Sequence, residues 1–249
     1  MTSPAILITG ASRGIGAQTA LLAAQRGYRV AINYVQNHRR AQQLAEQIQQ
    51  HGAEALLLQA DVADEQQVLR MFEQIDQTWG SLYGLVNNAG ILAPKTRLEA
   101  IDAARLQRIF ATNVFGSFYC AREAVKRMST RHSGQGGSIV NISSGAARIG
   151  APNDYIDYAA SKGAIETMTL GLAKEVAEEG IRVNGVRPGF IYTEMHADYG
   201  DPNRVDKMVH KVPMKRGGQP EEIAEAILWL LSDASSYTTG SFIDVTGGR

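Results

Sequence analysis

Residues 5–16, which read AILITGASRGIG, decide the fold of this chain. A run of apolar residues typical of a buried strand enters a turn that contains Gly10, Gly14 and Gly16, and residues 17–25 then read as a helix. Glycines let such a turn adopt positive φ angles and let a ligand approach the backbone closely. Free amide groups at the start of the following helix attract an anion. The stretch therefore predicts a strand, a tight turn and a helix around a pyrophosphate site.

The rest of the chain repeats this unit. Apolar, β-branched runs alternate with amphipathic segments, and no linker interrupts the alternation. Such a pattern is typical of βαβ units, in which helices cover both faces of a parallel sheet. We therefore expect an α/β fold over residues 1–249. The expected strands are residues 5–9, 30–32, 55–59, 82–86, 138–142, 181–186 and 242–245.

Composition narrows the class of partner and the compartment. The 25 basic residues balance the 25 acidic ones without a long run of either sign, so we expect small-molecule partners rather than nucleic acid or an anionic membrane. The single cysteine, Cys120, lies among apolar residues, which predicts a packed core position and a reducing compartment. Residues 5–8 begin a strand without a preceding signal sequence, and the apolar run 227–231 is too short to span a bilayer. These features predict a cytoplasmic protein.

Residues near the second strand bear on which dinucleotide binds. Proteins that select the form without a 2'-phosphate place Asp or Glu near the end of the second strand, about 20 residues after the glycine turn. Here residues 32–34 read Ile-Asn-Tyr, whereas Arg13 lies in the glycine turn and residues 38–40, His-Arg-Arg, open the next helix. Cations without a competing carboxylate favour a phosphate dianion, so we expect NADP rather than NAD. The alternative is that Arg39 and Arg40 only form a solvated helix face.

Polar residues also follow the third and fourth strands. Asp61 either accepts a hydrogen bond from an adenine amino group or, like Asp64, caps the helix that begins near Glu65. Residues 87–90 read Asn-Asn-Ala-Gly. The amides can tie neighbouring strands together and the glycine lets a ribose approach, although alone this motif predicts only a turn.

A tyrosine and a lysine stand four residues apart in residues 157–162, which read DYAASK and fit a helix. Residues i and i+4 share a helical face, so Tyr158 and Lys162 are expected to lie together. A free tyrosine titrates near about 10, and a fixed cation beside it stabilises the tyrosinate and lowers that pKa. The pair therefore predicts an acid/base group that works near neutral pH. By itself the spacing is common and also fits an ordinary helix.

Residues 10–14 also match G-x-S-x-G, the turn that presents the nucleophilic serine of α/β hydrolases. In that hypothesis Ser12, Asp198 and His210 form a catalytic triad. Two features count against it, since no earlier strand supplies an oxyanion loop and Gly16 has no role. A further alternative is a sensor or regulatory module that binds NADPH without turnover.

Five motifs occur together in an order and spacing that resemble the classical short-chain dehydrogenase/reductase family. They are residues 9–16, 87–90, 141–144 (Asn-Ile-Ser-Ser), 158–162 and 187–189 (Arg-Pro-Gly). The resemblance covers essentially the whole chain, which is similar to bacterial sugar-dehydrogenase-like and 3-oxoacyl-carrier-protein-reductase-like oxidoreductases. It implies a single doubly wound Rossmann domain with a parallel sheet of about seven strands, usually assembled as a homotetramer.

The resemblance also implies a reaction and roles for individual residues. A hydride passes between NADP(H) and a carbonyl or alcohol substrate, and no metal takes part. Tyr158 is the acid/base, and Lys162 lowers its pKa and binds the nicotinamide ribose. Ser144 polarises the carbonyl, and Asn113 holds a water of the proton relay. The residues expected to bind the cofactor are Gly10, Ser12, Arg13, Gly14, Ile15, Gly16, Asn33, Tyr34, Arg39, Asp61, Val62, Asn88, Ala89, Gly90, Tyr158, Lys162, Pro188, Gly189, Ile191 and Thr193.

Two of these roles have a competing residue nearby in the sequence. Ser144 lies fourteen residues before Tyr158, one more than in many relatives, so an insertion is expected in the loop 150–155 and Ser143 competes for the role. We prefer Ser144 because it closes the N-x-S-S run. Tyr155 is excluded as the acid/base because position 159 is Ala, so no lysine follows it four residues later.

The substrate is expected beside these residues, where segments 94–97, 145–155 and 189–199 bound a pocket of mixed polarity. Ligands of parallel sheets bind where strands end, and long loops at that edge are often lids. We therefore expect a substrate loop at about residues 189–215. Both sugars and small ketones fit this composition. The last strand, 241–245, is expected at a sheet edge that a partner subunit can cover.

Overall fold

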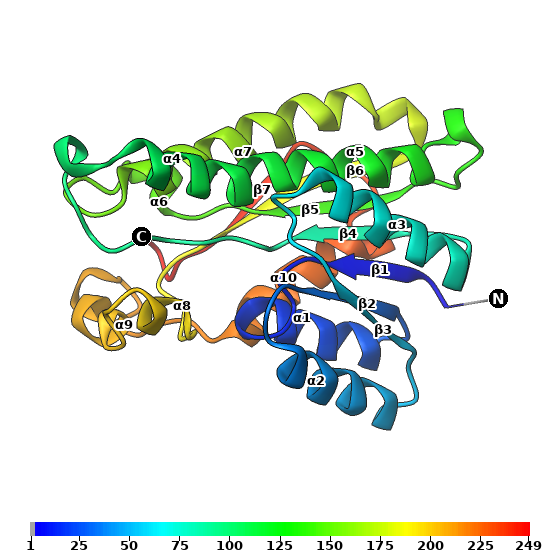
Figure 1. The fold of residues 1–249 in the computed structure, drawn as a ribbon, viewed down its shortest axis with the longest axis horizontal. Helices are drawn as coiled ribbons and strands as arrows, with labels where there is room; N and C mark the ends of the chain where they lie inside the picture. Colours follow the sequence, from blue (N-terminus) through cyan, green and yellow to red (C-terminus); the bar gives the residue numbers. More distant parts are fainter. Residues whose placement is uncertain (1–2) are drawn as a thin grey trace.

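The computed structural model describes residues 3–249, which contain a seven-stranded parallel sheet (Figure 1). The strand order is β3-β2-β1-β4-β5-β6-β7, and Ile8 of β1 pairs in register with Ile32 of β2 and Val86 of β4. This order confirms the predicted doubly wound α/β fold and places β7 at an edge, as expected. The strands are β1 (Ala5–Ile8), β2 (Arg29–Tyr34), β3 (Ala55–Gln59), β4 (Gly84–Asn87), β5 (Gly137–Ile142), β6 (Ile181–Pro188) and β7 (Phe242–Val245).

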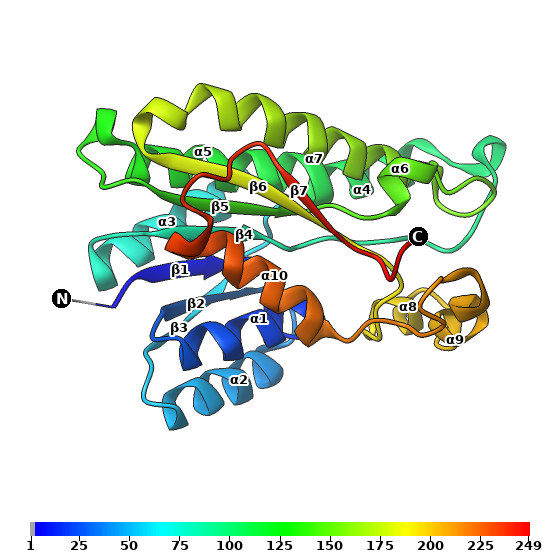
Figure 2. The ribbon, with the colours of Figure 1, turned by 180° about the vertical axis from the view of Figure 1, so that it is seen from behind.

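Helices cover both faces of the sheet (Figure 1, Figure 2). One face carries α1 (Gly14–Gln25), α2 (His38–Gln50) and α10 (Pro220–Leu231). The other carries α3 (Glu65–Trp79), α5 (Gly116–Met128) and α7 (Ile156–Glu175). Within residues 3–249, none of the helices combines the length and the apolar composition that crossing a membrane requires. The shorter segments are α4 (Ala103–Phe110), α6 (Ala146–Ile149), α8 (Met195–Asp198), α9 (Arg204–Met208), a π-helical turn (Ala111–Phe115) and 3₁₀ turns at Leu98–Ala100, Thr130–His132, Ala177–Glu179, Val209–Lys211 and Asp233–Ser235.

Alternation along the strands fills both layers of the core. Successive strand side chains point to opposite faces, so Ile6 and Ile8 of β1 pack with α1 and α10, whereas Leu7 packs in the other layer with Phe72 of α3. All of these side chains are fully buried. Complete burial of one such side chain contributes about 1.5 to 3 kcal/mol. The core thereby holds the strand ends, and the loops that follow them, in fixed positions.

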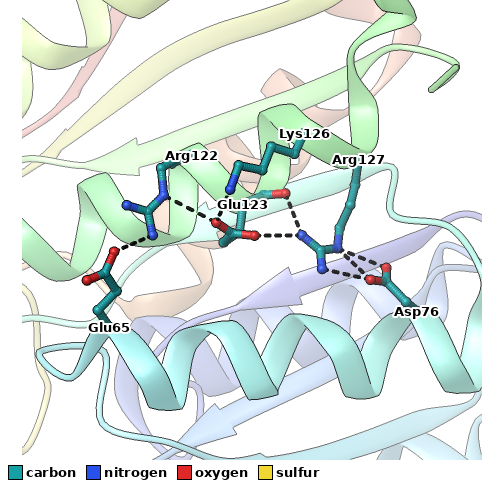
Figure 3. A network of polar contacts seen from close by, with 6 residues as sticks. All are labelled: Glu65, Asp76, Arg122, Glu123, Lys126 and Arg127. Carbon is teal, nitrogen blue, oxygen red and sulfur yellow. Dashed lines mark hydrogen bonds and ion pairs between the residues drawn. The ribbon is translucent and has the colours of Figure 1, made fainter. Parts of the chain in front are cut away.

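A network of ion pairs joins α3 to α5 (Figure 3). The buried carboxylate of Glu123 accepts hydrogen bonds from Lys126 at 2.9 Å and from Arg127 at 3.0 Å. Arg127 also donates to Asp76 of α3 at 2.7 Å. Burial by itself raises the pKa of Glu123, but the hydrogen bonds from its cationic neighbours outweigh burial and hold the pKa below its ordinary value. The network therefore fixes α5 against α3 with an ionised carboxylate between them.

Side-chain amides tie the carboxyl ends of the central strands together. Asn88 donates to the carbonyl oxygens of Thr9 at 2.8 Å and Gly10 at 3.1 Å, and Asn87 donates to Asn141 at 2.9 Å. These contacts join the ends of β1, β4 and β5, as the motif predicted. Because β1 lies between β2 and β4, the winding of the chain reverses here, and ligands of open parallel sheets bind at such a point.

Candidate functional site

A cleft of about 1540 Å³ lies at the carboxyl edge of the sheet. Its walls come from the loops that follow β1 to β6 and from Thr246, Gly248 and Arg249 near the C-terminus. Three predicted site residues, Gly16, Arg39 and Asn113, are not part of these walls. The predicted residues that line the cleft are Gly10, Ser12, Arg13, Gly14, Ile15, Asn33, Tyr34, Asp61, Val62, Asn88, Ala89, Gly90, Ser144, Tyr158, Lys162, Pro188, Gly189, Ile191 and Thr193.

The glycine turn packs tightly against the end of β4. Gly10 has a φ of +62°, and a Cβ there would lie 2.9 Å from Cα of Ala89. A Cβ on Gly16 would lie 2.6 Å from the side-chain nitrogen Nδ2 of Asn88. Gly16 is thus required for packing rather than for the cleft surface. The helix begins at Gly14, three residues earlier than predicted, and its N-terminus lies at the cleft wall, where backbone amides favour an anion.

Two predicted cofactor residues at the end of β2 are engaged within the protein. The side chain of Asn33 accepts a hydrogen bond from the backbone of Gly10 at 3.1 Å and donates to the backbone after β3 at 2.9 Å. The hydroxyl of Tyr34 lies 2.6 Å from Nδ1 of His38. Asn33 therefore shapes the glycine turn. Residues 35–37, Val-Gln-Asn, continue the cleft wall and bring no carboxylate to it.

The cations expected near a 2'-phosphate meet carboxylates of the segment after β6. Arg13 lines the cleft and pairs with Asp198 of α8. Arg40 pairs at 3.1 Å with Glu194, which precedes α8. Arg39 is exposed on α2 away from the cleft wall, as the alternative of a solvated helix face predicted. Arg13 therefore lies in the cleft wall and Arg40 beside it, each paired with an acidic group.

The structure separates the roles of Asp61 and Asp64. Asp64 caps α3, because its side chain accepts hydrogen bonds from the backbone of Gln66 at 2.9 Å and Gln67 at 3.2 Å. Asp61 accepts one hydrogen bond from the backbone of Ala63 at 2.9 Å and lines the cleft. Asp64 is thus the helix cap, and contact between Asp61 and an adenine stays a prediction.

Tyr158 and Lys162 lie together on α7. The ammonium nitrogen of Lys162 is 5.7 Å from the centroid of the Tyr158 ring and donates a hydrogen bond to the carbonyl oxygen of Ile142 at 2.7 Å. A Cβ on Gly90 would lie 3.4 Å from the same nitrogen, so the glycine leaves space above the lysine. Burial lowers the pKa of Lys162 to about 8.

The pKa of Tyr158 moves in the direction opposite to the expected one. Tyr158 is partly exposed and lines the cleft, and burial by the surrounding protein raises its pKa to about 12. A hydrogen bond with Ser144 acts in the lowering direction. For the protein residues by themselves the expected lowering by Lys162 is wrong, because desolvation of the phenolate outweighs a cation that lies beside the ring and is hydrogen-bonded to Ile142.

Ser143 and Ser144 have different partners. The hydroxyl of Ser143 donates to Glu166 of α7 at 2.8 Å. Ser144 lies close enough to the Tyr158 hydroxyl to act on its pKa in the lowering direction, and it accepts from the backbone of Ala146 at 3.1 Å. The geometry therefore places Ser144, rather than Ser143, beside the tyrosine hydroxyl, which supports the preference for Ser144 as the carbonyl-polarising residue.

Asn113 lies in the π-helical turn behind the cleft and is fully buried. Its side chain accepts a hydrogen bond from the backbone N–H of Ile91 at 2.8 Å, and it donates to the carbonyl oxygen of Ile91 at 3.0 Å and to the hydroxyl of Ser161 at 3.1 Å. These contacts engage both ends of the amide. The predicted water-holding role of Asn113 stays a prediction, and the side chain itself fixes the loop after β4.

The hydrolase alternative is wrong. Ser12 and Asp198 line the cleft, but Asp198 is paired with Arg13, and His210 is exposed outside the cleft wall. The three residues therefore do not form a triad. Tyr155 also lines the cleft, where the guanidinium group of Arg204 lies 4.8 Å from its ring centroid.

Several cleft residues were missed by sequence reasoning, and one predicted segment is absent from the walls. Segment 94–97 does not line the cleft. Arg108, Arg204, Lys211 and Arg249 do line it. These cations come from three separate parts of the sequence, namely α4, the segment of α9 with the following 3₁₀ turn, and the C-terminus. A lone arginine on a short helix carries no local signal. Arg204 and Lys211 both lie in the predicted substrate loop, residues 189–215, and their presence there was the available indication.

The doubly wound sheet, the glycine turn at its switch point and the Ser144–Tyr158–Lys162 group on one cleft define the class of Rossmann-type dinucleotide-binding enzymes. Comparison with known proteins leads to a family. The family model described as Enoyl-(Acyl carrier protein) reductase matches residues 10–249. The chain belongs to the short-chain dehydrogenase/reductase family and is a pyridine-nucleotide-dependent oxidoreductase.

Individual relatives match over nearly their full length. The chain is 59% identical over 243 residues to the uncharacterized oxidoreductase YgfF of Escherichia coli K12, with 98% of each chain covered. It is 38% identical to the 3-oxoacyl-[acyl-carrier-protein] reductase FabG of Staphylococcus aureus, covering 97% of this chain and 96% of that one. A crystal structure of a short-chain type dehydrogenase/reductase from Mycobacterium marinum superimposes with a TM-score of 0.91 at 37% identity, covering 99% of this chain and 96% of that chain.

Proposed function

We propose that this protein is an NADP(H)-dependent oxidoreductase that interconverts a carbonyl group and a secondary alcohol, with Tyr158 as the acid/base. The observation that carries the proposal is the convergence of Ser144, Tyr158 and Lys162 on the same cleft as the glycine turn. One end of the cleft can hold an anion at the N-terminus of α1, and the other presents a phenol that exchanges a proton.

The residues present fit a nicotinamide dinucleotide. The tight approach of Gly10 to Ala89 leaves backbone rather than side chain at the turn, and the helix amides after it suit a pyrophosphate. The space above Lys162, which a Cβ on Gly90 would enter, suits a ribose hydroxyl. Thr193 is proposed to hold the carboxamide. When bound, the nicotinamide supplies or accepts the hydride.

Proton transfer is the task of the protein. With its pKa raised to about 12 by burial, Tyr158 is protonated at neutral pH and can donate to a developing alkoxide. The hydroxyl of Ser144 is placed to hydrogen-bond the same oxygen atom, which stabilises the charge that develops there. Lys162, with a pKa of about 8, is largely charged at pH 7, and its positive charge stabilises the tyrosinate that alcohol oxidation requires.

The preference for NADP rests on the end of β2. Residues 33–37 bring no carboxylate to the cleft wall, whereas Arg13 lies there as a cation and Arg40 pairs with Glu194 of the wall. A carboxylate at this position would repel a 2'-phosphate and bind a free ribose hydroxyl instead. Guanidinium groups bind phosphate in two parallel hydrogen bonds. We therefore propose NADP(H) as the working cofactor.

Replacing the tyrosine tests the reaction. Tyr158→Phe removes the proton donor, so turnover of any accepted carbonyl falls by about 10² to 10⁴-fold or more while NADPH binding is retained. Absorbance of the nicotinamide band gives turnover, and fluorescence titration gives NADPH affinity. Tyr237→Phe is the matched control, because Tyr237 is fully exposed and outside the cleft. Turnover of Tyr158→Phe within a few-fold of wild type would sink the assignment. NADPH binding by the wild type without turnover of any compound in a broad carbonyl and polyol panel would indicate the sensor module instead.

We further propose a homotetramer in the cytoplasm. Phe115, Phe118 and Leu170 are large apolar side chains exposed on neighbouring helices of one layer, and β7 is a free edge strand of the described sheet. Exposed apolar patches of this kind often mark subunit contacts. Light scattering of the purified protein measures the assembly, and a monomer would contradict it. The buried thiol of Cys120 fits a reducing compartment.

A further inference from the structure

The substrate end of the cleft has an apolar wall next to the tyrosine. Leu92, Ala151 and Tyr155 form a small buried cluster against which Tyr158 and Met195 pack. This cluster is separate from the two main core layers and borders the cleft. A substrate carbonyl at Tyr158 would therefore have apolar surface beside it. Recognition of polar groups must come from further along the wall.

Arg204 of α9 stands at that position as a buried cation. It is 7% exposed, donates a hydrogen bond to Asp154 at 2.8 Å and lies over two rings, 4.8 Å from the centroid of Tyr155 and 5.7 Å from that of Phe190. Burying a guanidinium group is costly unless it is paired and stacked. These contacts meet that cost and hold Arg204 rigidly in the cleft wall.

A second guanidinium group shares one of these rings. Arg249 lies 4.6 Å from the centroid of Phe190 and also lines the cleft. Across residues 3–249, the side chain of Arg249 forms no ion pair, whereas Arg204 is paired with Asp154. Phe190 therefore carries two cations, of which one has a carboxylate partner and the other does not.

His196 of α8 completes the group with an unpartnered atom. Its Nδ1 is buried and has no hydrogen-bond partner among the described residues, although the ring lines the cleft. The charged groups around it are Arg204, Lys95 and Asp201. Burial, followed by Arg204, lowers its pKa, so the imidazole is neutral at pH 7 and can donate one hydrogen bond. That nitrogen is covered by protein, so it becomes a partner for a ligand group only if the ring turns toward the cleft.

The unpaired cation on this wall is Arg249. Asp154 pairs with Arg204 and Lys95, and Asp201 pairs with Lys95 and Lys207, whereas the guanidinium group of Arg249 contacts the Phe190 ring and pairs with no carboxylate side chain of residues 3–249. We infer that the substrate is an anionic carbonyl or hydroxy compound, whose carboxylate or phosphate is bound by Arg249, Arg204 and His196 while its apolar segment lies on the wall beside Tyr158. This inference rests on the proposed function for the reacting end and names the substrate class for the same site.

The test compares each acid with its neutral counterpart. Short 2-, 3- and 4-oxo acids are assayed with NADPH beside their methyl esters, and dihydroxyacetone phosphate is assayed beside dihydroxyacetone. A charge-assisted hydrogen bond supplies about tenfold or more in affinity, so the accepted anion should have a KM about tenfold below that of its neutral partner. The first arm identifies a carboxylate and the second a phosphate.

Arg249→Gln is the deciding variant, because the side chain of Arg249 has no carboxylate partner that the substitution would leave unpaired. It should raise the KM of the anion about tenfold and leave the neutral partner within about twofold. Arg70→Gln, which alters an exposed cation on α3 outside the cleft, should change neither. Equal KM values for anion and neutral partner in both arms, or an Arg249→Gln variant that affects both partners alike, would overturn the inference and leave the oxidoreductase assignment standing.

A binding measurement keeps the two proposals apart. Calorimetric titration of the same anions into wild type and Arg249→Gln, with and without NADP⁺, reports the subsite without turnover. If no carbonyl is reduced, the proposed function fails, yet anion binding that is lost in Arg249→Gln still supports the subsite. If no anion of either arm binds or turns over, the subsite is refuted.

Discussion

At the scale of single residues, the division of labour between two adjacent serines decides how the site is built. Ser143 donates to Glu166, which in turn accepts two hydrogen bonds from Arg187, at 2.6 Å and 2.9 Å. Because Glu166 belongs to α7 and Arg187 to β6, this chain of contacts locks the end of β5 between them. The hydroxyl of Ser143 is therefore engaged within the protein, whereas Ser144 lies beside Tyr158 and is available for chemistry.

Removal of Ser144 separates these roles. Ser144→Ala deletes a donor to the developing oxyanion, so kcat should fall by about 10² to 10³-fold. It also deletes the hydrogen bond that lowers the pKa of Tyr158, so that pKa rises further. Alcohol oxidation needs deprotonated tyrosine, and its pH profile should therefore move to higher pH.

The measurement is the pH dependence of kcat for oxidation of any accepted alcohol. Ser143→Ala is the control, since its hydroxyl is bound to Glu166 and its loss should not move the profile. A shifted profile in Ser143→Ala with an unshifted one in Ser144→Ala would reverse the assignment of the two serines.

Sequence spacing predicted which residues lie next to each other, but it did not predict how deeply they are buried or what they contact. The i, i+4 rule placed Tyr158 beside Lys162 because both stand on one regular helix. The direction of the tyrosine pKa was not predictable, since it depends on how deeply the hydroxyl is buried. The engagement of Asn113 with Ile91 was also not predictable, because it depends on a π-helical turn that no local pattern announces.

At the scale of elements, the contact between α3 and α5 shows how one carboxylate can hold two helices. Glu123 is buried and accepts hydrogen bonds from Lys126 and Arg127, and Arg127 also donates a hydrogen bond to Asp76 of α3 (Figure 3). The helix α5 continues directly from the turn that contains Asn113. A shift of α5 would therefore move the support of the loop after β4. The network stabilises the site from a distance.

Glu123→Gln should lower the free energy of unfolding by about 1 to 3 kcal/mol at neutral pH, because the neutral amide keeps one acceptor oxygen but loses the charge-assisted hydrogen bonds from Lys126 and Arg127. The folded-state pKa of Glu123 is depressed, so its contribution is present above the unfolded pKa and is lost as the pH falls through the folded pKa. The difference between wild type and Glu123→Gln in urea unfolding should accordingly shrink in acid.

Glu65→Gln provides the matched control for this experiment. Glu65 forms a half-exposed ion pair with Arg122, so its loss should cost less than about 1 kcal/mol and vary little with pH. Equal losses for both variants at neutral pH would contradict a special role for the buried carboxylate.

Element boundaries followed from the sequence where caps and periodicity agree. Pro220 and the acidic residues after it mark the start of α10, and the structure begins that helix at Pro220. The short helices α8 and α9 were not predicted, since four or five residues carry too little periodicity. They bring Asp198 and Arg204 to the cleft, and Glu194 precedes α8 there. This part of the site was not predictable from the sequence.

At the scale of the whole molecule, repetition of one βα unit predicted the sheet and its layers. Each strand carries apolar side chains on both faces, and this alone requires helices on both sides. What repetition cannot give is the pairing of residues far apart in the chain. Arg13 and Asp198 meet because the segment after β6 folds back over the first turn, and Arg204 and Arg249 meet on Phe190 for a similar reason.

Cofactor choice should be visible in the stability of the molecule. A ligand at 100 times its Kd stabilises the folded state by about 2.7 kcal/mol, which for a chain of this size raises Tm by about 5 to 10 °C. At equal concentration NADPH should raise Tm more than NADH does. Arg13→Gln should narrow the gap, because it removes a cation at the cleft wall. Thermal unfolding followed by circular dichroism measures these shifts, and an equal or larger shift with NADH would contradict the preference for NADP.

The pairing of Arg13 with Asp198 and of Arg40 with Glu194 has a consequence for ionic strength. Both pairs are about half exposed, so dissolved ions screen them as effectively as they screen an incoming phosphate, over a Debye length of about 8 Å at physiological ionic strength. In the proposed function, added salt weakens the phosphate contact and the internal pairs together. Titration of NADPH at increasing salt should therefore show a shallower loss of affinity than in the Glu194→Gln, Asp198→Asn double variant. The acidic side chains after β6 compete with the phosphate for the same cations, and because salt weakens both kinds of contact, cofactor binding becomes less sensitive to salt.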